Sequence, residues 1–425
     1  MLTQFEMRCW DERNVALSPA SCLGFDWPLA PNLPGNGGEQ HRLIFMETER
    51  PRPKRVLVNA LSARHGGGQT YVMNLLNSLP EDASLEIFVI APESLNIPTR
   101  RKNIRRVHVR GPVKNPFTRA LWERICLPKL VCELHADVLF CPGGIIGSKV
   151  PRDCRSVTTF QNMMPFDRVQ RNKYPLGYMR IRNWLLAREM ARSMAKADWV
   201  ICISEFARRV IQQRVPGLPG KTIVIPHGIN SIFRNDREPR PEWLPAGDYI
   251  LYVSVLDVYK AQLEVVRAFA LLKTLRPTSE KLILTGPERS RYADKVRDEI
   301  RRLDLQNDVF LTGLVSHETL PSLYHNALIN IFASECENCP NIMLEALASG
   351  RPLLASCRPP MPEFGGDAAI YFDPSSPREL AEKIQSIIDD PVRLMELSDK
   401  LTQRSLLYDW SRAARSTWEL IQNCA

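Results

Sequence analysis

A repeated alternation between short apolar runs and stretches of helical length is the feature that most constrains how this chain can fold. Arg55–Leu61 and Leu85–Ala91 are apolar almost throughout, as expected for strands that are buried on both faces of a parallel sheet. The alternation stops in the polar, proline-rich segment Ile232–Gly247 and restarts at Tyr249–Ser254. This pattern predicts two doubly wound α/β domains, each built on a parallel sheet.

The length of the chain supports the same division, because a single core stops growing at roughly 250–300 residues and this chain has 425. We predict an extended or disordered leader over residues 1–53, an N-terminal domain over 54–235, a C-terminal domain over 236–405, and a helix over 406–425 that packs back on the N-terminal domain. Ligands of open α/β sheets bind beyond the carboxyl ends of the strands. The loops expected at those ends are Gly66–Gly68, Pro142–Gly144, Gln161–Pro165, His227–Gly228, Asp257–Lys260, Gly286–Pro287, Gly313–Val315 and Glu335–Asn341.

Composition excludes several other classes of protein. The net charge of +9 favours anionic partners, but the sequence has no zinc finger, aromatic RNA-binding signature or basic tail, so nucleic acid is not an expected partner. No apolar run approaches the roughly 18 residues that a membrane-spanning helix needs. Cys336 and Cys339 have Cys-x-x-Cys spacing but lack a second pair, so neither a metal site nor a redox function is predicted.

The strongest chemical signal is a polar loop followed by a helix in the C-terminal half. Pro340 and Asn341 open the predicted helix, and Gly350 ends it. The free N–H groups and positive dipole of a helix N-terminus suit a diphosphate. Glu337 precedes the helix and Glu345 lies just over one turn inside it, so both carboxylates are placed to accept hydrogen bonds from sugar or ribose hydroxyls. The alternative is that one glutamate caps the helix and the other belongs to a solvated face.

Two further elements are candidates for binding phosphate. Lys260 follows a predicted strand and faces the expected cleft, where its charge offsets that of a departing diphosphate; the alternative is an ordinary surface lysine. Gly66, Gly67 and Gly68 separate the first strand from its helix and allow close approach of the backbone to a ligand, unless they serve only a tight turn. The loop is not G-x-G-x-x-G and lacks an acid at dinucleotide spacing, so a nicotinamide site is not predicted.

Glu337 and Glu345, which seven residues separate, match the E-x7-E motif, and here the sequence resembles the retaining glycosyltransferases, most closely glycosyltransferase family 4. The blocks ISEFARR, VIPHGIN, EALASGRPLLAS and MPEFGGDAAIYFDP resemble that family in the same order, from roughly Lys54 to the end of the chain. The resemblance implies the GT-B fold, in which two Rossmann-like domains face a central cleft. It also implies that the N-terminal domain binds the acceptor and the C-terminal domain binds the nucleotide-sugar.

The resemblance also assigns roles to individual residues. It implies that Glu345 binds the ribose of the donor and that Glu337 contacts a hydroxyl of the transferred sugar, with Glu337 and Lys260 as the catalytic pair. No metal and no cofactor are expected beyond the nucleoside-diphosphate sugar, which is a substrate, since no Asp-x-Asp pair occurs in a suitable loop. The expected donor-binding residues are Glu345, Asn341, Pro340, Gly66, Gly67, Gly68, Gly286 and Leu314.

Two positions depart from the family pattern. The family carries an arginine five residues before the lysine, and Val255 stands there in this chain. Gln161 occupies the likely position of a histidine in the N-terminal domain; an amide cannot act as a general base, but it can hydrogen-bond a sugar hydroxyl. We therefore interpret Gln161 and Asn162 as sugar or acceptor contacts, together with His227, for which a structural role is an equal alternative.

The segment Arg168–Lys196 is basic and carries Ile181, Trp184, Met190 and Met194 near helical spacing. Such a helix suits the surface of an anionic bilayer, but the favoured interpretation is a core helix with a solvated basic face.

The block MPEFGG contains Glu363, which we expect to start a helix and to have a packing role.

Taken together, these features predict a hexosyltransferase that moves a sugar with retention from a nucleoside-diphosphate donor to a sugar or to a lipid-linked saccharide, in the synthesis of a surface polysaccharide or glycolipid. We expect a cytoplasmic location, with the inner face of the plasma membrane as the site of any peripheral contact. Two alternatives stay open: a sugar-nucleotide epimerase on the same fold, and a non-catalytic sugar-nucleotide-binding subunit. Val255 and Gln161 favour the non-catalytic subunit, whereas Glu337, Glu345 and Lys260 argue against it.

Overall fold

The computed structural model describes residues 52–64, 66–80, 84–218, 220–235, 239–288 and 291–424. The described residues belong to one compact unit, Arg52–Ala425. The predicted leader, residues 1–53, lies outside the described residues except for Arg52 and Pro53. His65, next to the glycine loop, also lies outside them.

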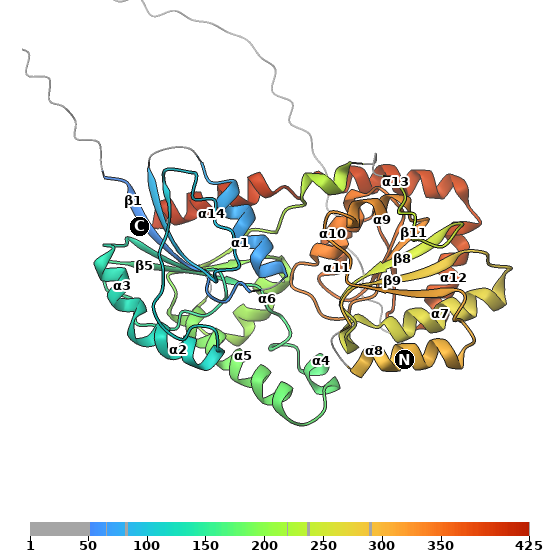
Figure 1. Cartoon of the computed structure of the whole chain (residues 1–425), viewed down its shortest axis with the longest axis horizontal. Helices are drawn as coiled ribbons and strands as arrows, with labels where there is room; N and C mark the ends of the chain where they lie inside the picture. Colours follow the sequence, from blue (N-terminus) through green and yellow to red (C-terminus); the bar gives the residue numbers. More distant parts are fainter. Residues whose placement is uncertain are drawn as a thin grey trace, which may run out of the picture. The chain divides into compact units, whose positions relative to one another are not determined.

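The first half of this unit is built on a parallel sheet of seven described strands in the order β3-β2-β1-β4-β5-β6-β7 (Figure 1). The register is regular, and Lys54 through Asn59 pair one to one with Leu85 through Ile90. The strands are β1 (Lys54–Asn59), β2 (Leu85–Ile90), β3 (Ile104–Arg106), β4 (Val138–Cys141), β5 (Arg155–Phe160), β6 (Trp199–Cys202) and β7 (Thr222–Val224).

Helices cover both faces of this sheet because successive strand residues point to opposite sides. In β1, Val56 and Val58 pack in the cluster that includes helix α1 and the C-terminal helix, whereas Leu57 packs with Leu127 and Val131 on the opposite face. Most residues of the central strands β1, β2, β4, β5 and β6 are thus buried, which explains the continuous apolar runs of the sequence. The helices are α1 (Gly67–Asn77), α2 (Pro116–Ile125), α3 (Leu127–Glu133), α4 (Arg168–Lys173), α5 (Tyr178–Lys196) and α6 (Glu205–Arg214).

The second half is built on a parallel sheet of six described strands in the order β10-β9-β8-β11-β12-β13. These are β8 (Tyr249–Val253), β9 (Lys281–Thr285), β10 (Val309–Gly313), β11 (Ile329–Phe332), β12 (Leu353–Ser356) and β13 (Ile370–Phe372). Its helices are the short 3₁₀ turns η1 (Ser231–Arg234) and η2 (Val258–Lys260), and α7 (Gln262–Leu275), α8 (Arg291–Arg302), α9 (Leu320–Asn326), α10 (Asn341–Ala348), α11 (Met361–Gly365), α12 (Pro377–Ile388) and α13 (Pro391–Ser405). The predicted fold class, two doubly wound parallel sheets, is confirmed.

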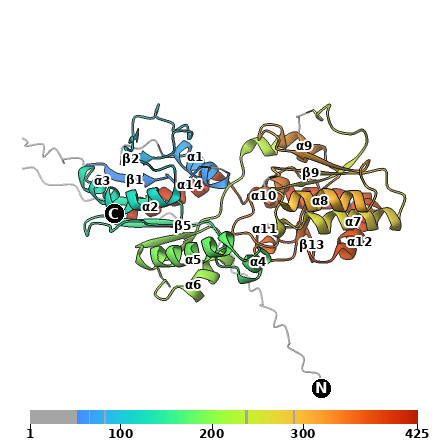
Figure 2. The ribbon, with the colours of Figure 1, turned by 60° about the horizontal axis from the view of Figure 1, so that its bottom comes forward.

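The last helix, α14 (Trp410–Cys424), returns to the first sheet and lies beside α1 (Figures 1 and 2). Trp418 is buried there; its indole Nε1–H donates to the carbonyl oxygen of Leu75 at 2.9 Å, and its ring meets Phe140 edge to face. A large aromatic ring with a satisfied polar atom gives this return a specific anchor.

Three local predictions differ from the structure. The sequence also predicts a strand at Val107–Val109, but the strand lies at Ile104–Arg106, and Val107 adds one further hydrogen bond to Val89 before the chain leaves the sheet. Helices α2 and α3 occupy a region where no helix was predicted. The interpretation of Arg168–Lys196 as one core helix is wrong in part, because the segment forms α4 and α5, and the N-terminal half of α5 is exposed.

In that segment, Met190 and Met194 are buried as a core helix requires, but Ile181 is 60% exposed and Trp184 is 52% exposed. The helix is therefore packed through its C-terminal half, while its N-terminal half presents apolar side chains at the surface.

Glu363 connects the two halves of the unit. It lies in the first turn of α11, as predicted, but its carboxylate accepts hydrogen bonds from the backbone N–H groups of Glu205 at 2.6 Å and Phe206 at 2.9 Å. These are the first two residues of α6, whose N-cap is Ser204. A negative charge at a helix N-terminus is stabilising, so Glu363 is a cap that one half supplies to the other.

Candidate active site

Two adjoining pockets lie at the loops that follow the strands. The larger has a volume of about 650 Å³ and the smaller about 330 Å³, and both are lined by Gly67, Asn341 and Ile342. The larger is lined by the predicted site residues Gly67, Gly68, Gln161, Asn162, His227, Lys260, Glu337, Pro340 and Asn341. The smaller is lined by Gly66, Gly67, Gly286, Leu314, Asn341 and Glu345. The structure thus brings all of these residues to one region.

Helix α10 begins where the two pockets meet. Pro340 is its N-cap and forms no side-chain cap, because a proline side chain has no hydrogen-bonding atom. The start of the helix therefore presents its dipole and backbone N–H groups at the pocket wall, as an anion-binding helix end does. Glu337 lines the larger pocket on one side of this helix end, and Glu345 lines the smaller pocket on the other.

Lys260 and Glu337 form an ion pair in the wall of the larger pocket. The Lys260 residue is 5% exposed, its ammonium lies 5.3 Å from the centre of the Phe332 ring, and the Ser334 hydroxyl donates to Glu337 Oε1 at 2.6 Å. Burial by itself disfavours the charged amine, but the Glu337 carboxylate outweighs it, so the pKa of Lys260 is raised above its ordinary value. Lys260 is therefore held as a cation at the pocket.

Glu345 has a different environment. Its side chain is 17% exposed, the Tyr324 hydroxyl donates to its Oε2 at 3.3 Å, and His317 Nε2 lies 3.9 Å from its Oε1. Burial lowers the pKa of His317, which is then neutral at pH 7 and supplies no cation. Burial, partly countered by the Tyr324 hydrogen bond, raises the pKa of Glu345 to about 8. This carboxyl group is mainly protonated at neutral pH and can both donate and accept hydrogen bonds.

His227 is a buried ring that joins the two halves at the pocket. Its ring packs at a tilt against the rings of Tyr71 and Trp410, with ring centres at 5.0 and 5.2 Å, and its Nδ1 lies 2.8 Å from Asn341 Oδ1. Burial, partly countered by that hydrogen bond, lowers the pKa of His227 to about 4. The neutral ring donates from Nδ1 to the Asn341 oxygen, and Nε2 has no hydrogen-bond partner among the described residues. His227 therefore positions Asn341 at the start of α10.

Two glycines in the wall of the smaller pocket have backbone conformations that other residues rarely adopt. Gly66 has φ +61°, in the left-handed region, and directly precedes α1. Gly286 has φ +146°, and a Cβ there would lie 2.0 Å from the carbonyl oxygen of Ser254. Leu314, also in this wall, is 74% exposed and offers an apolar surface to a ligand.

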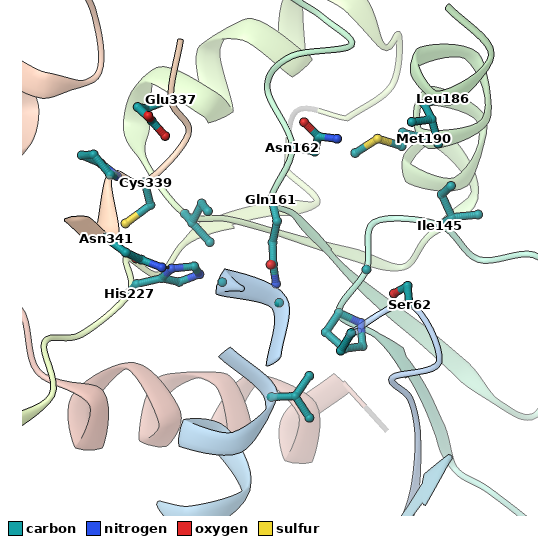
Figure 3. Close-up of a pocket in the computed structure, with 18 of the residues that line it drawn as sticks. Ser62, Ile145, Gln161, Asn162, Leu186, Met190, His227, Glu337, Cys339 and Asn341 are labelled. Atoms are coloured by element: carbon teal, nitrogen blue, oxygen red, sulfur yellow. The ribbon is translucent and has the colours of Figure 1, made fainter. Parts of the chain in front are cut away.

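Gln161 and Asn162 follow the end of β5 and lie between the two sides of the larger pocket (Figure 3). Glu337, Cys339, Asn341 and His227 gather on one side of Gln161, while Ser62, Ile145, Leu186 and Met190 lie on the other. The first group surrounds the start of α10, and the second belongs to the N-terminal half.

Several residues of the site were not predicted. Ser62, Arg119, Arg182, Leu186 and Met190 all line the larger pocket. Leu186 and Met190 have a sequence signal, since they recur with a helical spacing of four residues. Arg119 has none, because α2 itself was not predicted.

Within the described ranges, no group of three His, Cys, Asp or Glu side chains is arranged to hold a metal ion. Across those same ranges, no helix is both long and apolar enough to cross a membrane.

Comparison with known families identifies the class of protein. Residues 65–231 match the model for Glycosyltransferase Family 4, and residues 236–406 match the model for Glycosyl transferases group 1. The two matches follow one another along nearly the whole described chain. The two halves thus each match a glycosyltransferase model, and the resemblance to the group 1 glycosyltransferases that was drawn from the motifs is confirmed.

Individual relatives are distant. An O-antigen chain mannosyltransferase B of Escherichia coli is 26% identical over 272 residues, which cover 62% of this chain and 69% of the relative. A D-inositol 3-phosphate glycosyltransferase of Kineococcus radiotolerans is 25% identical over 246 residues, which cover 53% of this chain and 57% of the relative. A lipopolysaccharide 1,2-N-acetylglucosaminetransferase of Salmonella typhimurium is 25% identical over 296 residues, which cover 65% and 75%. This chain thus aligns with little more than half of some relatives.

Solved structures share the fold. A glycosyltransferase from Rickettsia africae superposes with a TM-score of 0.67 at 17% identity, covering 87% of this chain and 98% of the other. The Anabaena protein Alr3699/HepE in complex with UDP-glucose superposes with a TM-score of 0.66 at 16% identity, covering 87% and 99%. At such identities the likeness concerns the fold alone, which is GT-B.

Proposed function

We propose that this glycosyltransferase moves a hexose with retention from a nucleoside-diphosphate sugar to a saccharide acceptor, in the synthesis of a surface polysaccharide or glycolipid. The observation that carries the proposal is the placement of Glu345 and Glu337 on opposite sides of one uncapped helix start, each in its own pocket. The names of the Escherichia coli and Salmonella relatives favour the pathway, and the complexes of Alr3699/HepE with UDP and UDP-glucose favour the class of donor.

In the proposed binding mode, the nucleoside occupies the smaller pocket, where Glu345 contacts the ribose hydroxyls. The diphosphate lies at the start of α10, close to Lys260 and the backbone of Gly67 and Gly68. The sugar enters the larger pocket, where Glu337 contacts one of its hydroxyls. Charge at the diphosphate is offset by Lys260 and the helix dipole, so the proposal involves neither a metal nor a further cofactor.

In the proposed reaction, the bond between the sugar C1 and the phosphate oxygen breaks while C1 bonds to the acceptor oxygen. The departing diphosphate takes the acceptor proton, so no protein side chain has to act as the base. This fits Gln161, an amide that can orient a hydroxyl but cannot remove its proton. Lys260 stabilises the charge that develops on the leaving group, which is where electrostatic stabilisation has the largest effect on rate.

The test is turnover of nucleotide-sugars with and without saccharide acceptors, with the anomeric configuration of the product read by NMR. We expect a product that keeps the configuration of the donor. Replacing Glu337 with Gln should lower kcat roughly 10²-fold or more, since it removes both the sugar contact and the partner of Lys260. The exposed Glu382→Gln is the matched control.

Three outcomes would contradict the proposal. An isomerised sugar nucleotide formed without acceptor would indicate an epimerase. Binding without any turnover would indicate a non-catalytic subunit. Inversion of configuration at the anomeric carbon would contradict the retaining mechanism but would still show that the enzyme transfers a sugar.

We further propose that the enzyme works at the inner face of the plasma membrane. Helix α5 exposes Tyr178, Ile181 and Trp184 beside Arg180 and Arg188, and α2 exposes a stripe of residues four apart: Phe117, Leu121 and Ile125. Apolar side chains interleaved with cations suit an interface rich in anionic lipid.

The double variant Ile181→Ser, Trp184→Ser should float less with phosphatidylglycerol vesicles than the wild type, whereas Met395→Ser, at an exposed position on α13, should float as the wild type does. Equal flotation of both variants would contradict this contact.

A further inference from the structure

We propose that Arg119 and Arg182 form an anion subsite for the acceptor in the larger pocket, and that the acceptor therefore carries a phosphate-type group. Both side chains line this pocket. The inference rests on the proposed function, because it names a substrate class for the same site. It concerns the acceptor and not the donor, whose diphosphate has its own counter-charge in Lys260.

The surroundings of Arg119 leave much of its charge available. Its Nη1 donates to the Leu61 carbonyl oxygen at 3.4 Å, and its Nε lies 4.0 Å from Glu123 Oε1. Both contacts are at the long limit for their kind. Glu123 Oε1 also accepts from Asn59 Nδ2 at 3.1 Å. Burial, partly countered by that hydrogen bond and by Arg119, raises the pKa of Glu123, which weakens it further as a partner for the guanidinium.

A second arginine increases the positive charge at this position. Burial lowers the pKa of Arg119, the Glu123 carboxylate partly counters this, and the nearby Arg64 lowers it again, as a like charge does. The buried Nε of Arg64 has no hydrogen-bond partner among the described residues. Arg119 thus lies near a second guanidinium group, and the acid beside it, Glu123, has a raised pKa. Such an excess of cations at a pocket wall favours an anionic ligand, and arginine suits phosphate because it can form two parallel hydrogen bonds.

Arg182 contributes from a second helix. It precedes Leu186 by one turn of α5 and Met190 by two turns, and all three line the larger pocket. Residues four apart lie on one face of a helix, so Arg182 belongs to the stripe that α5 turns toward the cavity. The hydrogen bond from Arg182 Nη1 to Asn183 Oδ1 is 3.4 Å long. Arg182 is otherwise exposed, as a ligand contact at the mouth of a pocket would be.

The subsite lies on the far side of the pocket from the predicted catalytic pair. Arg119 contacts Leu61, the neighbour of Ser62, and Arg182 shares its stripe with Leu186 and Met190. Figure 3 shows Ser62, Leu186 and Met190 across Gln161 from Glu337. An acceptor that spans the pocket would thus place its anionic group at the arginines and its reacting hydroxyl near Gln161.

The experiment uses the full chain saturated with the nucleoside diphosphate that stabilises it most, so that the donor phosphate site is filled. Inorganic pyrophosphate is then titrated by calorimetry. We expect the wild type to bind pyrophosphate, and Arg119→Ala and Arg182→Ala each to weaken that binding about tenfold, as the loss of a charge-assisted hydrogen bond predicts. Arg119→Lys should retain part of the affinity. Arg124→Ala on α2 and Arg192→Ala on α5, both exposed, are the matched controls.

Wild-type binding of pyrophosphate that survives both alanine variants, or no binding at all, would overturn the subsite. If no nucleoside diphosphate binds, the proposed function fails instead, and the same titration without nucleotide still tests the two arginines.

Two further titrants distinguish the sources of the anion. Tighter binding of dihexanoyl phosphatidic acid than of glucose 1-phosphate indicates a lipid-borne phosphate, and the reverse order indicates a soluble sugar phosphate.

Discussion

The two glutamates of the E-x7-E motif differ in how the protein balances their charge. Glu337 pairs with Lys260, which is buried and kept cationic. Glu345 is buried beside a neutral His317, and the single hydrogen bond from the Tyr324 hydroxyl only partly counters the cost of burying its ionised form. A ribose that donates hydrogen bonds to Glu345 would favour the ionised form. Glu337 thus has a cationic partner within the protein, whereas the carboxylate of Glu345 would gain its main hydrogen-bond donors from a bound ribose.

The raised pKa of Glu345 predicts how stability depends on pH. The ordinary value is 4.5 and the folded value about 8, so between these limits the folded protein keeps a proton that the unfolded chain releases. The contribution of this group to folding stability therefore falls as pH rises from about 4.5 to about 8 and is level above that. Glu345→Gln cannot ionise, so the Tm of this variant minus that of the wild type should increase between pH 5 and pH 8.

Thermal unfolding at several pH values, with Glu382→Gln as the control, measures this difference. A constant difference in Tm across the range would show that Glu345 has an ordinary pKa in the folded protein.

Among the elements, helix α6 depends on a cap from the other half of the unit. The carboxylate of Glu363 accepts from two backbone N–H groups at its start. Glu363→Ala should destabilise the protein by about 1–2 kcal/mol, because it removes two charge-assisted hydrogen bonds at a helix N-terminus. Chemical denaturation measures the loss, and Glu382→Ala on α12 provides the comparison. An unchanged unfolding midpoint for Glu363→Ala would mean that the cap contributes nothing.

Elements buried on both faces were predictable, because continuous apolar runs mark parallel strands wherever they occur. Helix α2 was not predicted, although Pro116 and the spacing of four residues between Phe117, Leu121 and Ile125 suit a helix. These apolar residues face outward, so their pattern does not mark a core face. The start of α10 was predictable from Pro340, which can occupy a helix start but not a helix interior. The contact between Arg119 and the pocket depends on tertiary packing of α2, which no local pattern specifies.

For the molecule as a whole, contacts between the halves gather around the pockets. Tyr174 donates its hydroxyl proton to Asp257 at 2.9 Å, and Asn338 Nδ2 donates to the Phe160 carbonyl oxygen at 2.7 Å. Asn338 is the neighbour of Glu337, so the loop that carries one predicted catalytic residue is fixed by the opposite half. The sequence predicted that Lys260 and Glu337 belong to one site, but it did not predict that they form an ion pair with each other.

A thermal-shift screen of UDP-, GDP-, ADP- and dTDP-sugars against the wild type and Glu345→Ala tests directly whether a nucleotide-sugar binds across these two pockets. A ligand present at about one hundred times its Kd stabilises the folded protein by about 2.7 kcal/mol. We expect a clear shift with one class of nucleotide and the loss of that shift in Glu345→Ala. A shift that persists in Glu345→Ala, or no shift with any member of the panel, would contradict this binding mode.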